Sequence, residues 1–372
     1  MADTTNAIAF TEEQDAFREV VARFLATRAP AADVRALVEA GRPYDADVWQ
    51  ALALELGVTG LHLPEACGGG GFGPVELGIV LEEMGRQLYT GPYFTSSIMA
   101  GCTLHSADAD AQAALFPTLA DGSSIAALAL DSLSDPARLG LSITASADGA
   151  HLDGTAPIVP GGLEADVLLV LAAAGDGLGL FRVSAADAEI SPLQSLDPAR
   201  PVASVRFANS PAERIGTLSP QSVQRLWDTL SILLAHELVG AAEALLYGTV
   251  EYMEQRMQFG RPIASFQALK HRCADLLMEV ELAKALAREG ARVLASDASP
   301  TEIAHMAKSM ASDAAMSAAR AGVQLRGGIG FTWENDTHFY FKRIKSAEVL
   351  FGTPQQHREW LMTHLEATAH AH

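Results

Sequence analysis

The spacing of apolar residues changes twice along the chain and divides it into three zones. In residues 1–120, apolar positions recur every three or four residues, which is typical of helices that bury one face. One helix is predicted to begin at Thr11, because Gln14 follows three residues later and the pair is typical of a capping box. A second helix is predicted after Pro74. The apolar positions of the two are Phe10, Phe17, Val20, Val21, Phe24, Leu77, Val80, Leu81 and Met84.

Residues 121–216 change to short β-rich segments with Gly, Asp and Pro between them. The segments read SIAALAL, GLSITAS, AHLDG, ADVLLVLA, GLGLFRV and VASVRF. So many short strands in one stretch predict a small antiparallel barrel or sandwich.

Residues 217–372 return to helical spacing. Ser219 and Pro220 predict the start of a helix that lasts to Gly260, with a middle that is apolar nearly all round and so buried. A second helix is predicted over about 265–296. The third is predicted to open at Ser299-Pro300-Thr301-Glu302, read as a capping box with Pro at the first position, and to stop at Gly327-Gly328. Long helices with short connections predict a bundle.

The segment AEVLFGTPQQH, residues 347–357, predicts a sharp turn between two shorter helices. Gly352 is interpreted as the glycine that follows the first helix. Thr353 is interpreted as the N-cap of the next, with Pro354 at its first position and Gln356 at its third. Such a turn exposes backbone N–H groups that can hold a polar ligand, yet the residue at its crest is Phe351.

Composition and charge limit the partners. The chain has 372 residues, of which 49% are hydrophobic, and a net charge of −19. Residues 251–372 contain 14 basic and 14 acidic side chains, so residues 1–250 carry the whole excess. This balance argues against nucleic acid and anionic membranes as partners. An anionic small ligand would favour the last third of the chain.

The cysteines and the apolar runs bear on location. Cys67, Cys102 and Cys273 are far apart and form no C-x-x-C pair, which excludes a disulfide framework and a cysteine-based zinc site. That usage fits a reducing cytosol, so a cytoplasmic location is expected. The first ten residues lack the basic and apolar regions of a secretory signal. The longest apolar run, Val167 to Ala174, has the length of a strand, so no membrane insertion is expected.

Three glycine-containing motifs stand out. GGGGFG at 68–73 satisfies the pattern G-x-G-x-x-G, but no strand is predicted before it, and a loop between helices is the better interpretation. RMQFGRPIASFQ begins at Arg256 and QLRGGIGFTWE begins at Gln324. The second, taken alone, is explained by an ordinary helix end and an aromatic core stripe. The first could be an ordinary helix connection, but its spacing is long enough that chance agreement with a known pattern is small.

Taken together, the last two motifs resemble signatures of the acyl-CoA dehydrogenase family, and the resemblance covers nearly the whole chain. HLPEACGGGGFG followed by ELGIVLEEMG also looks like that family's N-terminal loop and helix. The resemblance implies an N-terminal all-α domain over 1–120, a middle β-barrel or sandwich over 121–216, and a C-terminal four-helix bundle over 217–372.

The family binds FAD between subunits, and the resemblance assigns cofactor contacts to this chain. Arg256 would meet the pyrophosphate of a neighbour's flavin, because a planar, permanently charged guanidinium suits a diphosphate, and Phe259 would pack beside it. The remaining contacts implied are Gln324, Gly327, Gly328, Thr353 and Gln355. The resemblance also implies an acyl-CoA substrate, an electron-transfer flavoprotein as electron acceptor, and assembly as a homo- or hetero-oligomer.

The residue that performs the family's chemistry is missing. A glutamate takes the α-proton of the acyl-CoA while the flavin takes the β-hydride, and the usual position of that glutamate is held here by Phe351. Some relatives place the glutamate on the first long bundle helix, which corresponds to about Leu230, with Ser231 beside it. Neither position carries a carboxylate.

Flavin-side motifs of the middle zone are also degenerate. The family's TEP-x-x-GS stretch reads LDSLSDPARLG at 130–140, and its W-I-T strand reads IVP at 158–160. The chain therefore keeps the elements that serve a neighbour's flavin and has lost those that hold its own. This split resembles one subunit of heteromeric α2β2 dehydrogenases from an actinobacterial branch that acts on steroid side chains and other bulky acyl-CoAs.

Three alternatives stay open from the sequence. The chain could be self-sufficient with a displaced carboxylate base, for which Glu348, Asp228 and Glu334 are candidates. It could be a flavoprotein of the same fold with other chemistry, such as a monooxygenase or nitroalkane oxidase. It could also be a scaffold without a ligand. The identity of the acyl chain is not encoded in any residue singled out.

Overall fold

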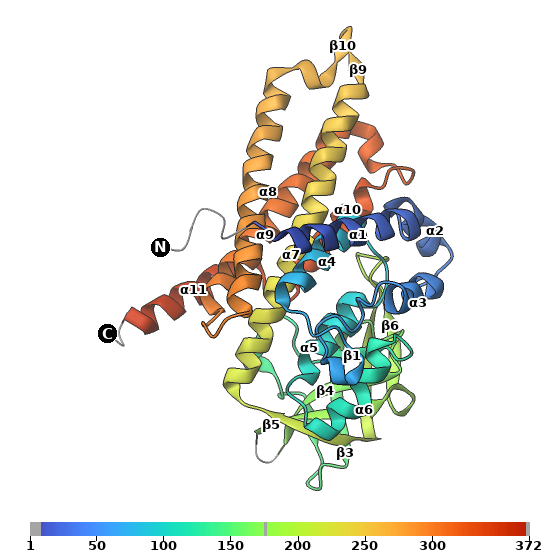
Figure 1. The fold of residues 1–372 in the computed structure, drawn as a ribbon, viewed down its shortest axis with the longest axis vertical. Coiled ribbons are helices and arrows are strands. Elements are labelled where there is room, and N and C mark those ends of the chain that lie inside the picture. The colour runs from blue at the N-terminus through green and yellow to red at the C-terminus, as the bar shows by residue number, and fades with distance from the viewer. Residues whose placement is uncertain (1–8, 175–176, 370–372) are drawn as a thin grey trace.

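The computed structural model describes residues 9–174 and 177–369 and has the predicted order of a helical, a β and a second helical part. In Figure 1 the long helices of the last third form a column whose far end carries a small hairpin. The β part lies at the opposite end of the molecule, and the N-terminal helices lie against the side of the column. The division into domains at 120 and 216 remains a prediction.

The N-terminal part consists of short helices, as predicted. The capping box at Thr11 is confirmed, since the Gln14 amide donates to Thr11 Oγ1 at 3.2 Å and the Thr11 amide donates to Gln14 Oε1 at 3.1 Å. The predicted loop at 68–73 is confirmed, and it leads directly into the helix that starts at Pro74. The helices are α1 (Glu12–Arg28), α2 (Val34–Glu39), α3 (Ala46–Leu54), α4 (Pro74–Arg86), a π-helical segment (Tyr93–Ala100), α5 (Gly101–Leu104) and α6 (Ala109–Ala120).

The β part is one mixed sheet in the order β6-β7-β3-β2-β4-β5-β8, with β1 also paired to β4. The expectation of a purely antiparallel arrangement is wrong at β4, which pairs in parallel with β1 and β2. Strands β2 and β3 lie in the chain between β1 and β4, and β3 lies between β2 and β4, which supplies the long connection that parallel neighbours need. The strands are β1 (Ala126–Ala129), β2 (Ile143–Ala145), β3 (His151–Pro160), β4 (Val167–Ala174), β5 (Gly177–Ser184), β6 (Glu189–Leu193), β7 (Val202–Pro211) and β8 (Glu213–Leu218).

The helical column departs from prediction at two ends. The first helix stops at Gln255 rather than Gly260, and residues 257–262 form the small hairpin β9–β10 instead. The capping box predicted at Ser299 is wrong, because α9 begins at Thr301 with Pro300 before it and no side-chain cap, and Ser299 Oγ lies 3.3 Å from Thr301 Oγ1 instead. The helices are α7 (Pro220–Gln255), α8 (Gln267–Leu294), α9 (Thr301–Arg326), α10 (Thr337–Val349) and α11 (Pro354–Ala369), and the hairpin strands are β9 (Met257–Gln258) and β10 (Arg261–Pro262).

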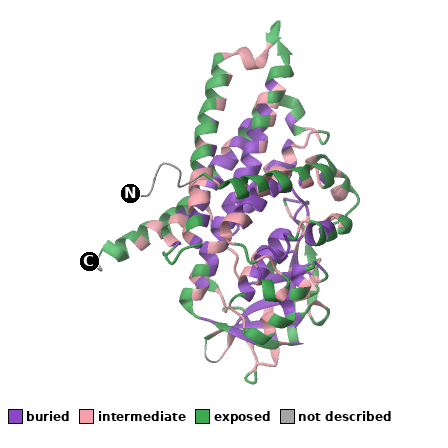
Figure 2. Cartoon of the chain, viewed as in Figure 1, coloured by how far each residue is buried: buried purple, intermediate pink, exposed green. Residues whose placement is uncertain are grey.

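Helix α7 is the central element of the core. Its composition and length would suit a membrane span, but 89% of its most apolar window is buried inside the protein, so it is a core helix. Figure 2 shows the buried residues gathered where α7 crosses its neighbours. Gly240 lets α4 and α7 approach closely, because an added Cβ there would lie 1.9 Å from the Glu82 carbonyl oxygen.

Candidate functional site

The turn between α10 and α11 is held in an unusual backbone conformation at Phe351. Helix α10 ends at Val349, and the first left-handed residue after it is Phe351, with φ 59°. The prediction that Gly352 fills this role is therefore corrected, although Gly352 also has a positive φ of 108°. A left-handed phenylalanine costs about 1–2 kcal/mol. Two hydrogen bonds hold it, from the Phe351 amide to the Leu133 carbonyl at 2.7 Å and from Trp227 Nε1 to the Phe351 carbonyl at 3.0 Å.

The side chain of Phe351 is sealed inside an aromatic cluster. It is 0% exposed. Its ring meets Trp227 edge-on with centroids 5.3 Å apart and tilts against Phe94 at 6.5 Å. Leu230, one helical turn beyond Trp227, is also fully buried in the same apolar core. Neither position expected for the base therefore has room for a charged, hydrated group.

A buried lysine supports the turn from below. Lys308 of α9 donates from Nζ to the Gly352 and Glu348 carbonyls, each at 3.2 Å, and to Ser312 Oγ at 3.1 Å. Burial lowers the pKa of Lys308 to about 7. Its role is to hydrogen-bond the backbone carbonyls that have no partner within a helix because the chain turns there. Nothing in the sequence distinguished this lysine from a solvated one.

The start of α11 forms the predicted cap. The Gln356 amide donates to Thr353 Oγ1 at 3.3 Å, and the Thr353 amide donates to Gln356 Oε1 at 2.9 Å. Gln355 is exposed, and its side-chain amide donates to Glu359 at 2.9 Å. Thr353 is therefore engaged in the cap, while the Gln355 side chain lies at the surface, where a ligand can replace its partner.

The other expected cofactor residues lie at the far end of the column. Arg256 is exposed at the C-terminal cap of α7. Phe259 in the hairpin is 90% exposed and has a φ of 53°. Its ring meets that of Phe266 edge-on, with centroids 6.1 Å apart. The hairpin thus presents a cation and an aromatic ring outward.

The glycine pair that follows α9 lies at the same end. Arg326 Nη1 donates to Thr249 Oγ1 at 2.5 Å, which places the end of α9 beside the last turns of α7. Gln324, Gly327 and Gly328 are all exposed. A Cβ added at either glycine would meet nothing within 4 Å. The backbone here is open to a flat or extended ligand.

The seven expected cofactor residues therefore fall into two separate groups. Thr353 and Gln355 lie near Lys308 in the first half of α9, whereas Gln324, Gly327 and Gly328 lie at its end with the hairpin residues (Figure 1). Lys308 and Gly327 are roughly 28 Å apart at the rise of an α-helix. One chain does not assemble these residues around one ligand.

The far group nevertheless fits a dinucleotide held by a second chain. Arg256 forms no ion pair with any residue in 9–174 or 177–369, so its charge is available to a diphosphate. Phe259, three residues after Arg256, is 90% exposed, and Phe331, which follows the glycine pair, is 80% exposed. Exposed rings next to an unpaired arginine are typical of a surface that another molecule covers.

The displaced-base candidates lie elsewhere. Asp228 is buried, accepts from Gln224 Nε2 and Thr301 Oγ1 at 2.8 Å each, and has its pKa raised by burial. It is turned about 200° around α7 from Leu230, so it faces α9 rather than Phe351. Glu348 is paired with Lys345. Glu334 is exposed, and hydrogen bonds from its own backbone and Thr332 lower its pKa.

A groove runs next to the sealed turn. One hollow of about 460 Å³ is lined by residues from the 135–137 segment, α7, α9 and α11, including Trp227, His305 and Trp360. A second of about 700 Å³ continues between β5, β8 and the start of α7. Both border Pro136 and Ala137, in the degenerate TEP segment. Asp135, which the sequence reasoning missed, lines the first hollow, but its carboxylate accepts from the Ala137 amide at 2.9 Å as a cap.

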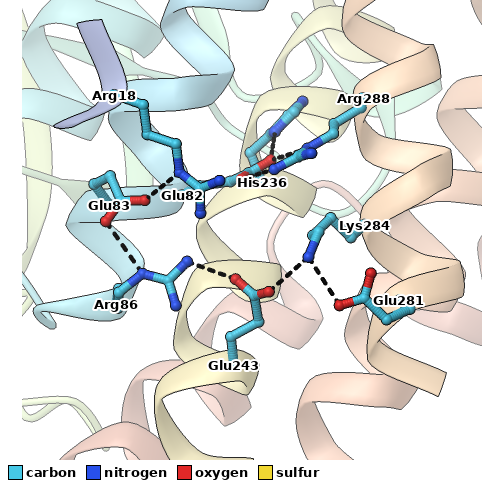
Figure 3. A network of polar contacts seen from close by, with 9 residues as sticks. All are labelled: Arg18, Glu82, Glu83, Arg86, His236, Glu243, Glu281, Lys284 and Arg288. Carbon is cyan, nitrogen blue, oxygen red and sulfur yellow. Dashed lines mark hydrogen bonds and ion pairs between the residues drawn. The ribbon is translucent and has the colours of Figure 1, made fainter. Parts of the chain in front are cut away.

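One strongly charged region of the described core is the seam between α4, α7 and α8, drawn in Figure 3. A second buried cluster pairs Arg200 and Arg343 with Glu237 and Asp197. Glu82 accepts from Arg288 Nη2 at 2.9 Å and meets His236 Nδ1 at 3.0 Å. Glu243 joins Arg86 at 2.6 Å to Lys284 at 2.8 Å. These carboxylates are fully paired, so the seam is a structural network rather than a source of a free base.

Comparison with known proteins agrees with this architecture. Residues 11–123 match the model of the acyl-CoA dehydrogenase N-terminal domain, and residues 229–365 match that of the C-terminal domain. The chain is 37% identical to acyl-CoA dehydrogenase IpdE2 of Mycobacterium tuberculosis over 93% of its own length and 95% of the relative's.

Two solved structures are also similar. The ChsE4–ChsE5 complex from Mycobacterium tuberculosis matches with a TM-score of 0.88 and 25% identity, over 96% of this chain and 98% of the matched chain. A variant of the Tcur3481–Tcur3483 steroid ACAD matches with a TM-score of 0.86 and 28% identity, over 96% and 99%.

Proposed function

Because the chain belongs to the acyl-CoA dehydrogenase family, we propose that it is the subunit that lacks the catalytic glutamate in a heteromeric α2β2 acyl-CoA dehydrogenase. The family consists of oxidoreductases that act on CH–CH bonds, and FAD is its cofactor. Bound FAD accepts the β-hydride of the acyl-CoA. The α-proton would be taken by a glutamate of the other kind of subunit.

The observation that carries this proposal is the burial of Phe351. An aliphatic or polar replacement at the glutamate position could leave space for a water or a displaced base. Here the ring fills that space, packs on Trp227 and Phe94, and has its backbone fixed on both sides. A site in which the base position is a packed core residue does not perform proton abstraction.

The residues of this chain would then serve the cofactor of the neighbouring subunit. Arg256 would hold the diphosphate, with its guanidinium unpaired and exposed for that purpose. Phe259 would cover an adjoining apolar face, and the open backbone at Gly327 and Gly328 would let the dinucleotide approach. These roles bind and orient; none moves a proton.

A self-sufficient enzyme is the second candidate, and Asp228 is the observation in its favour. Asp228 is a buried carboxylate with a raised pKa, and its partners Gln224 and Thr301 line the groove beside Trp227. A raised pKa is typical of a general base. However, both carboxylate oxygens are engaged, and Trp227 stands between the groove and Phe351. A flavoprotein with other chemistry has no specific support.

The partners follow from the same proposal. The ChsE4–ChsE5 structure is a complex of two different chains, which supports a heteromeric assembly here. A steroid-sized or fatty acyl-CoA is the proposed substrate class, because a relative is named a steroid ACAD. We further propose electron-transfer flavoprotein as the acceptor and the cytoplasm as the location.

The test compares the purified chain alone with the chain mixed with a glutamate-bearing family subunit. Visible absorption reports bound flavin, and mass in solution reports assembly. The proposal predicts a colourless or substoichiometric chain that gains flavin and mass only on mixing. A yellow homo-oligomer with about one flavin per chain, bleached by an acyl-CoA, would overturn it.

A further inference from the structure

A separate cavity lies beside α7, on a different face of that helix from the one that contacts Phe351. It has a volume of about 350 Å³ and opens between the loop before α4, the end of α5 and the first turns of α7, with Leu294 closing one side. On α7 its lining positions recur at three- and four-residue spacing, as one helix face does. That face carries Leu226, Thr229 and Leu233, whereas Trp227 faces Phe351. The cavity is therefore distinct from the flavin-related surfaces.

Most of the wall is apolar, and its leucines are at most 8% exposed. Phe72 at the rim is 54% exposed. The other apolar side chains that line the cavity are Pro74, Leu77, Cys102, Leu226, Leu233 and Leu294. An open hollow of this size and lining is typical of a site that buries the apolar body of a small molecule.

One cation at the cavity forms no ion pair among the described residues, although its charge acts on Asp228. Arg225 of α7 donates a long hydrogen bond of 3.3 Å to the Leu294 carbonyl, and no carboxylate within residues 9–174 or 177–369 pairs with it. The neighbouring hydroxyls are used locally: Ser222 bonds Ser219 at 3.0 Å, and Thr229 donates to the Arg225 carbonyl at 2.7 Å. The guanidinium is thus the free anion-binding group, and the positive end of α7 adds to its attraction.

The opposite wall offers neutral polar groups. His62 and His105 tilt against each other with ring centroids 5.4 Å apart. Both ring nitrogens of His62 are buried without a hydrogen-bond partner among the described residues. The ring lies close against the Gly101 backbone, since a Cβ added at Gly101 would lie 2.9 Å from it. Burial lowers the pKa of His62 to about 3, so the ring is neutral and has both a donor and an acceptor nitrogen.

We propose that this cavity binds a small apolar carboxylic acid that carries a hydroxyl or keto oxygen. The carboxylate pairs with Arg225 at the mouth, the apolar body fills the leucine-lined hollow, and the oxygen meets the histidine wall. The ligand touches α4, α5 and α7 at once and so stabilises their packing. The inference does not depend on flavin binding or on the heteromeric assembly.

The test uses three rigid probes of one shape: hydroxyadamantane carboxylate, adamantane carboxylate and the neutral adamantane methanol. Calorimetric titration of the full chain is expected to rank their affinities in that order. Arg225→Met is expected to weaken both acids by about tenfold or more and to leave the alcohol within twofold. Unchanged alcohol binding also shows that the variant is folded.

Two further variants sharpen the result. Arg23→Met, at an exposed position of α1, is the matched control and is expected to change nothing. His62→Phe is expected to remove the advantage of the hydroxy acid over the plain acid. The proposal is overturned if the alcohol binds as tightly as the acids, or if Arg225→Met leaves all three affinities unchanged.

Discussion

Phe351 and Phe259 are both phenylalanines in the left-handed region, and their surroundings are opposite. Phe351 is 0% exposed, with its backbone bonded to Leu133 and Trp227. Phe259 is 90% exposed in a hairpin beside an unpaired arginine. A residue that is strained and buried contributes to the packing of its own chain. A residue that is strained and exposed is available to a molecule outside the chain. We therefore assign cofactor contact to this chain through Phe259, and proton abstraction to a partner subunit because Phe351 is buried.

The largest expected effect comes from placing the family's glutamate at the sealed position. Phe351→Glu buries a carboxylate without a partner inside an aromatic cluster, so it should cost more than about 3 kcal/mol of unfolding free energy. Phe351→Leu, the matched control, should cost about 1 kcal/mol. Urea unfolding measures both. A stable, active Phe351→Glu chain would show that the position is a vacant base site and not a core position.

A smaller effect is expected at the exposed hairpin. Arg256→Gln should weaken flavin retention in the assembled complex by about tenfold or more, because a charge-assisted contact to the diphosphate is lost. The stability of the isolated chain should stay within about 0.5 kcal/mol. Arg320→Gln, also exposed on the column, is the control. Equal flavin loss in both variants would remove the assigned role of Arg256.

The lysine below the turn predicts a pH dependence. Lys308 has a folded pKa of about 7 against an ordinary value of 10.5, so between these values the unfolded chain binds more protons. Its contribution to stability should therefore rise with pH across that window, by up to about 1.4 kcal/mol per pH unit. Lys308→Met should remove this slope in urea unfolding between pH 7 and pH 9. An unchanged slope would mean that Lys308 stays protonated in the fold.

The smallest expected effect on the chain itself is at Phe259. Phe259→Ala removes a ring that contacts little of its own chain, so unfolding free energy should change by no more than about 0.5 kcal/mol. Assembly with the partner subunit should weaken, as read by mass in solution at decreasing concentration. A clear loss of stability in the isolated chain would instead make Phe259 part of the fold.

Local rules made much of the fold predictable. The caps at Thr11, Ser219 and Thr353 are set by side chains within three residues, and all three form as expected. The box at Ser299 does not form, because the helix begins one residue later than predicted, at Thr301, and the Ser299 hydroxyl meets Thr301 Oγ1. Strands β6 and β8 were missed because their apolar residues are few and their pairing is set by the rest of the sheet.

The candidate site was predictable by position and not by environment. The sequence locates Arg256 and Phe351, but only the structure shows that the Arg256 side chain is exposed and the Phe351 side chain is buried. Lys308 and Trp227 are missed for the same reason, since their contacts with the turn come from helices distant in sequence. The separation of the cofactor residues along α9 likewise follows from tertiary packing.

The most direct test of the central claim is flavin bleaching by an acyl-CoA in the assembled complex after the partner subunit's glutamate is changed to glutamine. Rapid mixing under anaerobic conditions would follow a single turnover. The account predicts that bleaching is lost almost completely while flavin content and mass are unchanged, because this chain supplies no base. Bleaching that persists, and that Asp228→Asn then removes, would contradict it and identify a base within this chain.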